Sequence, residues 1–420
     1  MNTPKLRFKE FSGEWEENLY GDIYTFYSTN SFPRDKLNYE DGEVYNIHYG
    51  DIHTKFSTLF KLEDEYVPYV NKDINLSKIK DENYCKVGDL VIADASEDYA
   101  DIGKTMEIIS LNSKKTLAGL HTFLARPNKD IVALGYMAYM LQSWNIRWQV
   151  MRISQGTKVL SLATSRLSKV ILNLPKKPEQ TKIAKFLTST DKKIEQLSKK
   201  ITLLQSYKKG LMQKIFSQEI RFKADDGSLF GEWEEKKFKD IFERVRRKNK
   251  ENNLNVLTIS AQQGLINQQK YFTKSISAKD VTGYYLIHKD EFAYNKSYSK
   301  GYPMGAIKKL NRYEKGVVST LYICFKAIND DVSFLEQVFN NGNLNKELHK
   351  IAQEGARNHG LLNMSVVEFF NDMYLTIPCI AEQQKIANFL SSIDTKIQQT
   401  QKQLEATQAF KKALLQQMFV

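Results

Sequence analysis

The chain has 420 residues, of which 42% are hydrophobic and 26% are charged, and its formal net charge is +12. This length allows two or three domains, and a basic chain with 22 tyrosines and 23 phenylalanines favours an anionic partner, nucleic acid first. We expect a cytoplasmic protein without membrane attachment: the N-terminus lacks a signal-peptide core, and the longest apolar run, residues 131–141, is too short to cross a bilayer. Three cysteines without ligand spacing agree with reduced thiols.

The first 26 residues contain two short sequences that return later in the chain. Leu6-Arg7-Phe8-Lys9 recurs as Ile220-Arg221-Phe222-Lys223. Gly13-Glu14-Trp15-Glu16-Glu17 recurs as Gly231-Glu232-Trp233-Glu234-Glu235. We expect each tryptophan to pack a helix end against a globular unit.

The residues that follow differ between the two halves, yet their elements keep one order. Val44–Ile47 and Val256–Ile259 are predicted strands, each running into a glycine turn. Further matching pairs are strands at 88–93 and 289–294 (with Asp89 matched to Asp290), strands at 120–125 and 317–325, helices at 132–141 and 333–339, and glycine-containing basic loops at 155–158 and 354–359. The order predicts two related α/β units with different surfaces.

Each half ends in a long predicted helix. Pro175-x-x-x-Glu179-Gln180 returns 203 residues later as Pro378-x-x-x-Glu382-Gln383, and 21 of the 45 positions in 172–216 and 375–419 are identical. Apolar residues recur in both copies at alternating steps of four and three, with a few polar interruptions, which is typical of a coiled-coil seam. The predicted seam residues are Ile183, Leu187, Ile194, Leu197, Ile201, Leu204, Leu211, Ile215, Ile386, Leu390, Ile393, Ile397, Leu404, Leu414 and Met418.

Two such helices are expected to pair antiparallel and to hold the two α/β units at a fixed distance, because long amphipathic helices are poorly stable alone. The alternative is a generic coiled coil with an external partner. The outer face of the first helix carries Lys192, Lys193, Lys199 and Lys200, which suits either a partner, DNA or solvent.

The chain lacks a recognisable catalytic constellation. It contains no Pro-Pro dipeptide, so the Asn/Asp-Pro-Pro-aromatic motif of amino-methyltransferases is missing. The segment Gly103-Lys104-Thr105 resembles the end of a phosphate-binding loop, but Asp98 stands where the first glycine is required. His48 and His53 flank Asp51 without a third metal ligand placed by sequence, so we predict no metal and no cofactor in this chain.

The paired Pro-x-x-x-Glu-Gln-x-x-Ile-Ala-x-x-Leu helices and the Gly-Glu-Trp-Glu-Glu entries resemble the DNA-specificity (S) subunits of type I restriction–modification systems. The resemblance covers essentially the whole chain. It implies a first target recognition domain at 1–174, with residues 1–20 or so near the C-terminal helix, a central helix at 175–219, a second target recognition domain at 220–377 and a C-terminal helix at 378–420.

The resemblance also implies what the chain binds. An S subunit is a noncatalytic DNA-binding protein that reads a bipartite, asymmetric target with a fixed gap. The helices would bind two methyltransferase (modification) subunits that use S-adenosylmethionine, and restriction subunits that use ATP and Mg²⁺ may join the complex. One feature departs from this picture, because residues 1–175 are net −2, with acidic stretches at Glu63–Glu65 and Glu97–Asp101.

Residue type selects the predicted DNA contacts. Lysine and arginine suit phosphates, whereas glutamine, asparagine and histidine suit base edges. The candidates are His48, Tyr49, His53, Lys55 and Lys158 in the first half, and Gln262, Gln263, Asn295, Lys296, Ser297, Tyr298, Ser299, Lys300, Arg357, Asn358 and His359 in the second. Two other classes of function stay open: a coiled-coil adaptor whose globular units bind proteins, and a self-contained nucleic-acid enzyme with a diverged site.

Overall fold

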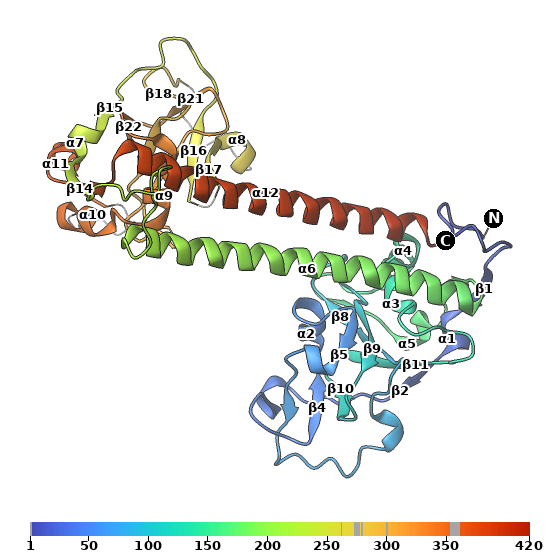
Figure 1. The fold of residues 1–420 in the computed structure, drawn as a ribbon. Coiled ribbons are helices and arrows are strands. Elements are labelled where there is room, and N and C mark those ends of the chain that lie inside the picture. The colour runs from blue at the N-terminus through green and yellow to red at the C-terminus, as the bar shows by residue number, and fades with distance from the viewer. Residues whose placement is uncertain (1, 262, 273–277, 279, 300, 353–361) are drawn as a thin grey trace. The chain divides into compact units, whose positions relative to one another are not determined.

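The computed structural model describes residues 2–261, 263–272, 278, 280–299, 301–352 and 362–420. The chain forms two compact units: unit 1 comprises residues 1–198 and 402–420, and unit 2 comprises residues 199–401. The two long helices, α6 (Lys177–Phe216) and α12 (Ile380–Gln417), each contribute one part to each unit (Figure 1). The predicted α/β fold class with two long helices is confirmed.

Unit 1 contains a five-stranded and a four-stranded sheet. The first has the order β2 (Tyr24–Tyr27), β11 (Thr122–Pro127), β7 (Leu90–Ala93), β9 (Thr105–Ser110) and β5 (Leu59–Lys61). The second has the order β10 (Lys115–Ala118), β4 (Val44–Ile47), β6 (Tyr69–Val70) and β3 (Leu37–Asn38). Two further antiparallel pairs are β1 (Glu16–Leu19) with β13 (Ile171–Leu174), and β8 (Ala95–Ser96) with β12 (Leu160–Ser161).

The shorter helices of unit 1 lie between these strands in the chain. The α-helices are α1 (Tyr20–Ile23), α2 (Tyr49–Thr54), α3 (Met137–Met140), α4 (Trp144–Ile153) and α5 (Thr164–Leu167). The 3-10 helices are η1 (Arg34–Lys36), η2 (Leu62–Asp64) and η3 (Asp81–Asn83).

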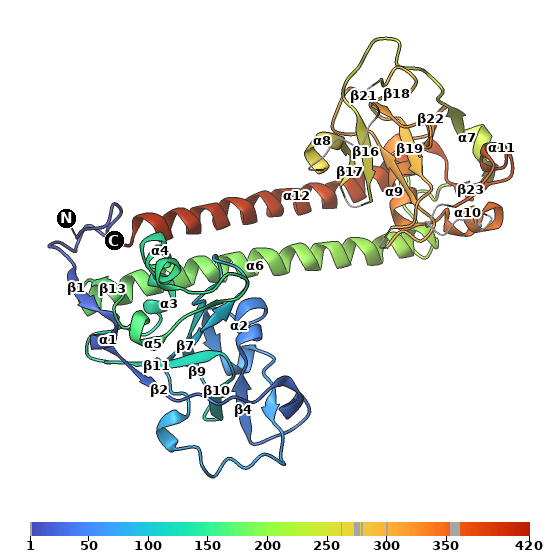
Figure 2. The same cartoon turned by 180° about the vertical axis from the view of Figure 1, so that it is seen from behind.

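Unit 2 repeats much of this plan. Its four-stranded sheet has the order β15 (Phe242–Arg244), β22 (Ile323–Ala327), β19 (Phe292–Asn295) and β20 (Ala306–Lys309). Figure 2 shows β19 and β22 of this sheet. The antiparallel pairs are β14 (Glu234–Lys237) with β23 (Tyr374–Ile377), β16 (Leu257–Ser260) with β17 (Gly264–Asn267), and β18 (Tyr285–His288) with β21 (Lys315–Val318). The helices are α7 (Phe238–Ile241), α8 (Gln268–Tyr271), α9 (Val332–Asn341), α10 (Asn345–Ile351) and α11 (Val366–Asn371).

A buried Glu–Gln pair opens each long helix. In unit 1 Glu179 accepts two hydrogen bonds of 2.7 Å from Arg7. In unit 2 Glu382 accepts bonds of 2.8 and 2.9 Å from Arg221, at the matching repeat position. Both carboxylates are buried, and each arginine supplies the positive charge without which a buried carboxylate would destabilise the fold. The repeated motif is thus a structural anchor.

The glutamine of each pair joins the helix to its globular core. Gln180 accepts from the Ala133 backbone N–H at 2.9 Å and donates to the carbonyls of Ile131 and Pro175. Gln383 likewise accepts from the Asp331 N–H and donates to the Asp330 carboxylate and the Pro378 carbonyl. Both amides therefore satisfy their own polar atoms and backbone groups of the adjoining loop.

The tryptophans of the repeated entry segments pack as predicted. Trp15 is buried in one core with Leu187 of α6 and Leu414 of α12. Trp233 lies edge-on to Phe216 and Phe334 in unit 2, at centroid distances of 6.4 and 6.2 Å.

Each entry segment is also bonded through its backbone to the C-terminal end of a long helix, in the same way in both units. The Leu6 N–H donates to the Gln417 carbonyl at 2.8 Å, as the Ile220 N–H donates to the Lys214 carbonyl at 3.1 Å. Residues 417 and 214 are equivalent in the 203-residue repeat, so the start of the chain takes the same place beside α12 that residues 220–223 take beside α6.

The long helices lie antiparallel within each unit. In unit 1 Asp191 of α6 pairs with Lys411 of α12 at 2.6 Å, and in unit 2 Lys208 of α6 pairs with Asp394 of α12 at 2.7 Å. These two ion pairs are the same pair in the repeat, and both stand at polar interruptions of the seam. The fifteen predicted seam residues named above are all buried or half-buried.

The structure corrects four details of the predicted order. Val44–Ile47 leads into helix α2 where a glycine turn was predicted, whereas Gly264 does lie in a hairpin turn, with φ +80°. The helix predicted at 132–141 is helical only over α3, and the strand predicted at 317–325 is two strands, β21 and β22.

The fourth correction concerns register. Asp89 corresponds to Glu291 and not to Asp290: Asp89 accepts from the Lys86 N–H and Glu291 from the His288 N–H, both at 2.8 Å. The preceding residues, Gly88 and Asp290, both have positive φ, a conformation that glycine adopts readily and aspartate tolerates. The two positions share this backbone conformation but not the residue type, so the sequence did not reveal that they are equivalent.

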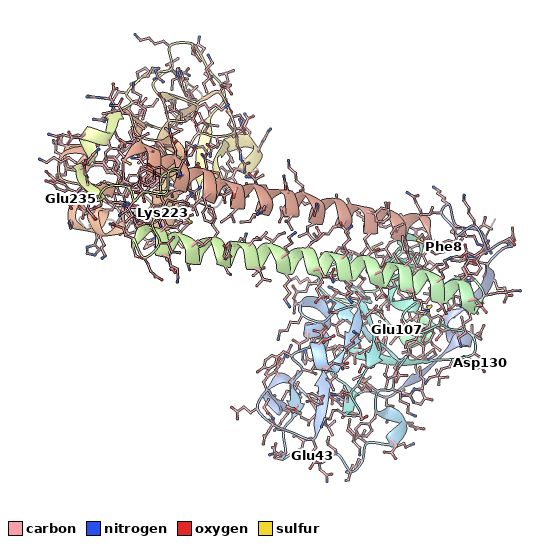
Figure 3. All side chains as sticks on the ribbon, in the orientation of Figure 1. Phe8, Glu43, Glu107, Asp130, Lys223 and Glu235 are labelled. Atoms are coloured by element: carbon pink, nitrogen blue, oxygen red, sulfur yellow. The ribbon has the colours of Figure 1, made fainter. Side chains whose placement is uncertain are left out.

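One buried carboxylate in unit 1 has no cation in contact among the residues that the structure describes. Glu107 of β9 accepts backbone bonds from Gly135 at 2.6 Å and Ala138 at 3.0 Å and lies inside the globular part of unit 1 (Figure 3). Burial raises its pKa to about 7, although these hydrogen bonds favour the charged form. The equivalent residue in unit 2 is Lys309, which pairs with Glu336 at 3.2 Å.

We expect Asp191→Ala to lower the free energy of unfolding by about 1–3 kcal/mol, because it also leaves Lys411 and the Tyr139 hydroxyl without their carboxylate. Urea unfolding measures this loss. Glu195→Ala, an exposed position one turn along α6, is the control and should cost less than about 0.5 kcal/mol. The double variant Asp191→Ala with Lys411→Ala should lose less unfolding free energy than the sum of the losses in the two single variants. Losses that simply add would show that the pair is not coupled.

Glu107 should make unit 1 less stable at alkaline pH. Because the folded pKa is raised, the stability linked to protonated Glu107 is complete below the unfolded pKa and is lost as pH rises through about 7. A shift of this size corresponds to about 3 kcal/mol. Between pH 5.5 and 8.5 the melting temperature of the native protein should therefore fall more steeply than that of the Glu107→Gln variant, whose amide does not titrate. Parallel pH profiles would contradict this assignment.

Candidate nucleic-acid interface

Helix α2 carries four of the candidate residues of unit 1. His48 is its N-cap and accepts from the Gly50 N–H through Nδ1 at 3.2 Å, and only 6% of its surface is exposed. Burial and nearby Arg34 lower the pKa of His48 to about 4, so the ring is neutral at pH 7. Tyr49 lies against His48 at 4.7 Å and edge-on to His53 at 6.2 Å. His48 therefore supports the cluster, while half-buried Tyr49 and His53 form its accessible part.

A buried carboxylate positions the cations beside this cluster. Asp51 is fully buried and accepts from Arg34 at 2.7 and 2.8 Å and from Lys55 at 2.9 Å. Burial by itself would raise the pKa of Asp51, but the hydrogen bonds from Arg34 and Lys55 outweigh it and lower the pKa. Two cations on one anion leave a net positive surface at this point, which suits phosphate.

Strand pairing brings the late loop of unit 1 to α2. His53 Nε2 lies 3.0 Å from the Ala95 carbonyl of β8, and β8 pairs with β12, which closes the loop that holds Lys158. His121, at the start of β11, lies 3.3 Å from Asp94 and 5.2 Å from the Tyr49 ring. Tyr49, His53, His121 and the Lys158 loop are therefore gathered around the end of β7.

Several carboxylates in the acidic stretches of unit 1 accept hydrogen bonds or form ion pairs within the unit. Glu63 accepts from the Ser110 hydroxyl and Glu65 from the Ser57 N–H. The Glu97–Asp101 loop directly follows β8, close to the cluster, but Asp98 accepts from the Ala100 N–H and Asp101 lies 3.6 Å from Lys104.

Unit 2 presents its candidates at matching places. Gln263 is exposed in the β16–β17 turn. Asn295 ends β19 and Lys296 to Ser299 form the loop that follows it, with Tyr298 exposed and the others half-buried. Ala261 beside the turn and Tyr302 at the end of the loop pack against the same core cluster, so the two segments border one surface region of unit 2.

Leu362, which follows the late loop of unit 2 in the chain, lies beside this region. The Leu362 N–H donates to the Lys296 carbonyl at 3.0 Å, as the Leu162 N–H donates to the Asp94 carbonyl at 2.8 Å in unit 1. In both units the late loop thus ends beside the strand that follows the Asp89/Glu291 position. The candidates Gln262, Lys300, Arg357, Asn358 and His359 lie outside the described residues.

Sequence reasoning missed several residues of these surfaces. Arg34 and His121 gave no local signal, because only folding brings them to α2. Tyr39 and Tyr66 are stacked at 4.5 Å, and Lys55 lies 5.5 Å above the Tyr39 ring. The charge run Arg244–Lys250 could have been found by composition: Arg246 is exposed, Arg247 pairs with Glu291 at 3.0 Å, and Lys248 lies over Tyr285.

Two further classes of site were sought in the described ranges. No group of three or more histidine, cysteine, aspartate or glutamate side chains there is arranged to hold a metal ion. Across the same residues, no helix is both long enough and apolar enough to span a bilayer.

Comparison with known proteins gives one consistent similarity. A family model described as the type I restriction modification DNA specificity domain matches residues 13–205. The chain is 26% identical over 247 residues to a putative type I restriction enzyme MjaX specificity subunit of Methanocaldococcus jannaschii, covering 56% of this chain and only 54% of that protein. It is 25% identical over 331 residues to the MjaVIII specificity subunit of the same organism, covering 73% and 74%.

A solved structure shares the fold. The crystal structure of a type I restriction-modification system S subunit from M. genitalium has a TM-score of 0.56 at 13% identity, covering 100% of this chain and 99% of that one. At this identity the likeness concerns the fold alone.

The buried anchor Asp51 provides a test of the unit 1 surface. Because its folded pKa is lowered, the stability that it contributes is present above the unfolded pKa near 3.8 and is lost as pH falls. We expect Asp51→Asn to reduce the free energy of unfolding at pH 7 by about 1–3 kcal/mol, with the deficit shrinking below about pH 4. Chemical unfolding at both pH values measures it. Asp64→Asn, at an exposed carboxylate, is the control and should change little; an equal effect of both variants would exclude the anchoring role.

Proposed function

The chain belongs to the DNA specificity subunits of type I restriction–modification systems, and on this premise we propose that it reads a bipartite, asymmetric duplex target. The observation that carries the proposal is the contrast between scaffold and surface. The Glu–Gln anchors, entry segments and helix ion pairs recur in both units, whereas the residues at the corresponding strand ends differ, with Tyr49 and His53 in one unit and Gln263 and Asn295 in the other.

Each surface has the chemistry of DNA recognition. Arg34, Lys55 and Lys158 in unit 1 and the Arg244–Lys250 run in unit 2 would contact phosphates and supply salt-dependent affinity. The glutamine and asparagine side chains of unit 2 suit the N6 and N7 edge of adenine, and the histidines of unit 1 offer ring nitrogens for hydrogen bonds to base edges. Different side chains at equivalent places would read different half-sites.

The partners follow from the same premise. Methylation would be carried out by modification subunits that bind S-adenosylmethionine, and any cleavage by restriction subunits that use ATP and Mg²⁺, while this cytoplasmic chain supplies recognition without catalysis. Tyr207 of α6 and Phe410 of α12 support two partner positions, because these aromatic side chains are equivalent in the repeat and are 57% and 51% exposed.

Genome-wide methylation in the host, with and without this gene, tests the proposal. One bipartite motif should lose adenine methylation on deletion, and a methyltransferase should copurify with the chain. Unchanged methylation together with no copurifying methyltransferase would reject the proposal.

Single variants then assign each surface. His53→Ala should relax the base preference in one half-site and Gln263→Ala that in the other, with a roughly 10- to 100-fold loss of discrimination for each base contact removed. Methylation profiling of the two variant strains measures both. Gln269→Ala, an exposed glutamine on α8 nearby, is the control and should leave the motif unchanged. A uniform loss of methylation at both half-sites in either variant would contradict the assignment.

A further inference from the structure

Helix α4 of unit 1 is held firmly on three sides. Its buried face places Ile146 and Val150 in the core that also contains the ends of α6 and α12. On one flank Gln149 exchanges hydrogen bonds of 3.0 and 2.9 Å with the Ile171 backbone, and on the opposite flank Arg147 donates to the Ala100 carbonyl at 3.1 Å. The orientation of α4 is therefore fixed before any partner binds.

The remaining side of α4 carries an aromatic and cationic stripe. Trp144 is 65% and Trp148 45% exposed, and the Arg152 guanidinium lies 4.5 Å from the Trp148 ring centroid. Positions i, i+4 and i+8 share one helix face. Two neighbouring exposed tryptophans with an arginine match the composition of protein–protein hot spots, in which tryptophan and arginine dominate the binding energy.

The internal repeat shows that this stripe is special to unit 1. Helices α4 and α10 end at the equivalent positions Ile153 and Ile351, and the buried Ile146 and Val150 correspond to Leu344 and Leu348. In this alignment Trp144 and Trp148 correspond to Gly342 and Lys346. The fold therefore does not need the tryptophans.

Charge indicates the character of the occupant. Residues 131–175 contain five arginines and lysines and no aspartate or glutamate, in a region that is otherwise acidic. On the Arg147 side, the Glu97–Asp101 loop borders α4. The stripe thus offers an apolar centre with a mainly positive rim, which suits a protein surface with an apolar pocket and acidic edges.

We propose that Trp144, Trp148 and Arg152 form an extra docking surface for the modification subunit, so that the copy bound at unit 1 is held more tightly than the copy bound at unit 2. This inference rests on the proposed function. The stripe shares its core with the end of α12, which carries the exposed Phe410, so one partner seated on that helix would reach α4. The modification subunits would therefore bind in two unequal steps.

Titration of the full chain with its modification subunit tests the proposal, with calorimetry and native mass spectrometry resolving the two steps. Trp144→Ala with Trp148→Ala should weaken the tighter step at least 30-fold, or about 2 kcal/mol at ~1.4 kcal/mol per tenfold. The weaker step should change less than about twofold. Lys346→Ala, at the position equivalent to Trp148, is the matched control and should leave both steps unchanged. Arg152→Ala, which keeps both tryptophans, should weaken the tighter step by a smaller factor.

Three results would overturn the proposal: two steps that stay unchanged, two steps that weaken equally, or a loss of duplex DNA binding with unchanged steps, which would make the stripe a DNA surface. Thermal unfolding of each variant separates loss of binding from loss of folding, and the more exposed Trp144→Ala alone should retain the native melting temperature. Failure of the native chain to bind any modification subunit would instead reject the proposed function itself, and this inference with it.

Discussion

The architecture depends on the buried Glu–Gln pair at the start of each long helix. Glu179 and Glu382 are carboxylates without access to solvent, so each requires its arginine, and those arginines stand on the entry segments. Gln180 and Gln383 satisfy backbone groups of the loops that lead into the cores. Entry segment, helix and globular core are thereby joined at one point in each unit, and removal of either partner would leave an unpaired polar group inside.

This anchoring separates the scaffold that is repeated in both units from the surface that differs between them. The polar groups of the anchors are satisfied by the entry-segment arginines and by groups of the loops beside the helix starts, so the loops at the far ends of the strands can change without disturbing them. Unit 1 follows its first repeated strand with helix α2, whereas unit 2 follows it with a hairpin. Yet Leu162 and Leu362 donate equivalent backbone bonds at the same strand end of the two units. Two different surfaces therefore fit one scaffold.

The acidic character of unit 1 is compatible with DNA binding because its charges are placed locally. The buried Asp51 holds Arg34 and Lys55, so one carboxylate orders two cations at the surface. Several acidic side chains of the exposed stretches accept hydrogen bonds from their own loops. Net charge summed along the chain conceals this arrangement, since phosphate responds to charges within about a Debye length.

Sequence by itself determined the elements that repetition and periodicity encode. The two long helices, their seam and the packing of Trp15 and Trp233 were predictable because an amphipathic period and a second copy are visible in one dimension. The register between the matching strands of the two units was harder to predict from the sequence. Gly88 and Asp290 are different residue types, and only their shared positive φ shows that the two positions are equivalent.

Tertiary structure alone decided which side chains meet. Arg34, helix α2 with Asp51 and His53, His121 and Lys158 lie far apart in the sequence, and folding brings them to one region of unit 1. The exposed stripe of α4 was also hidden, because only the packing of Ile146 and Val150 fixes which face of the helix is buried. Local patterns encode the elements, whereas sites arise from long-range contacts that no single segment records.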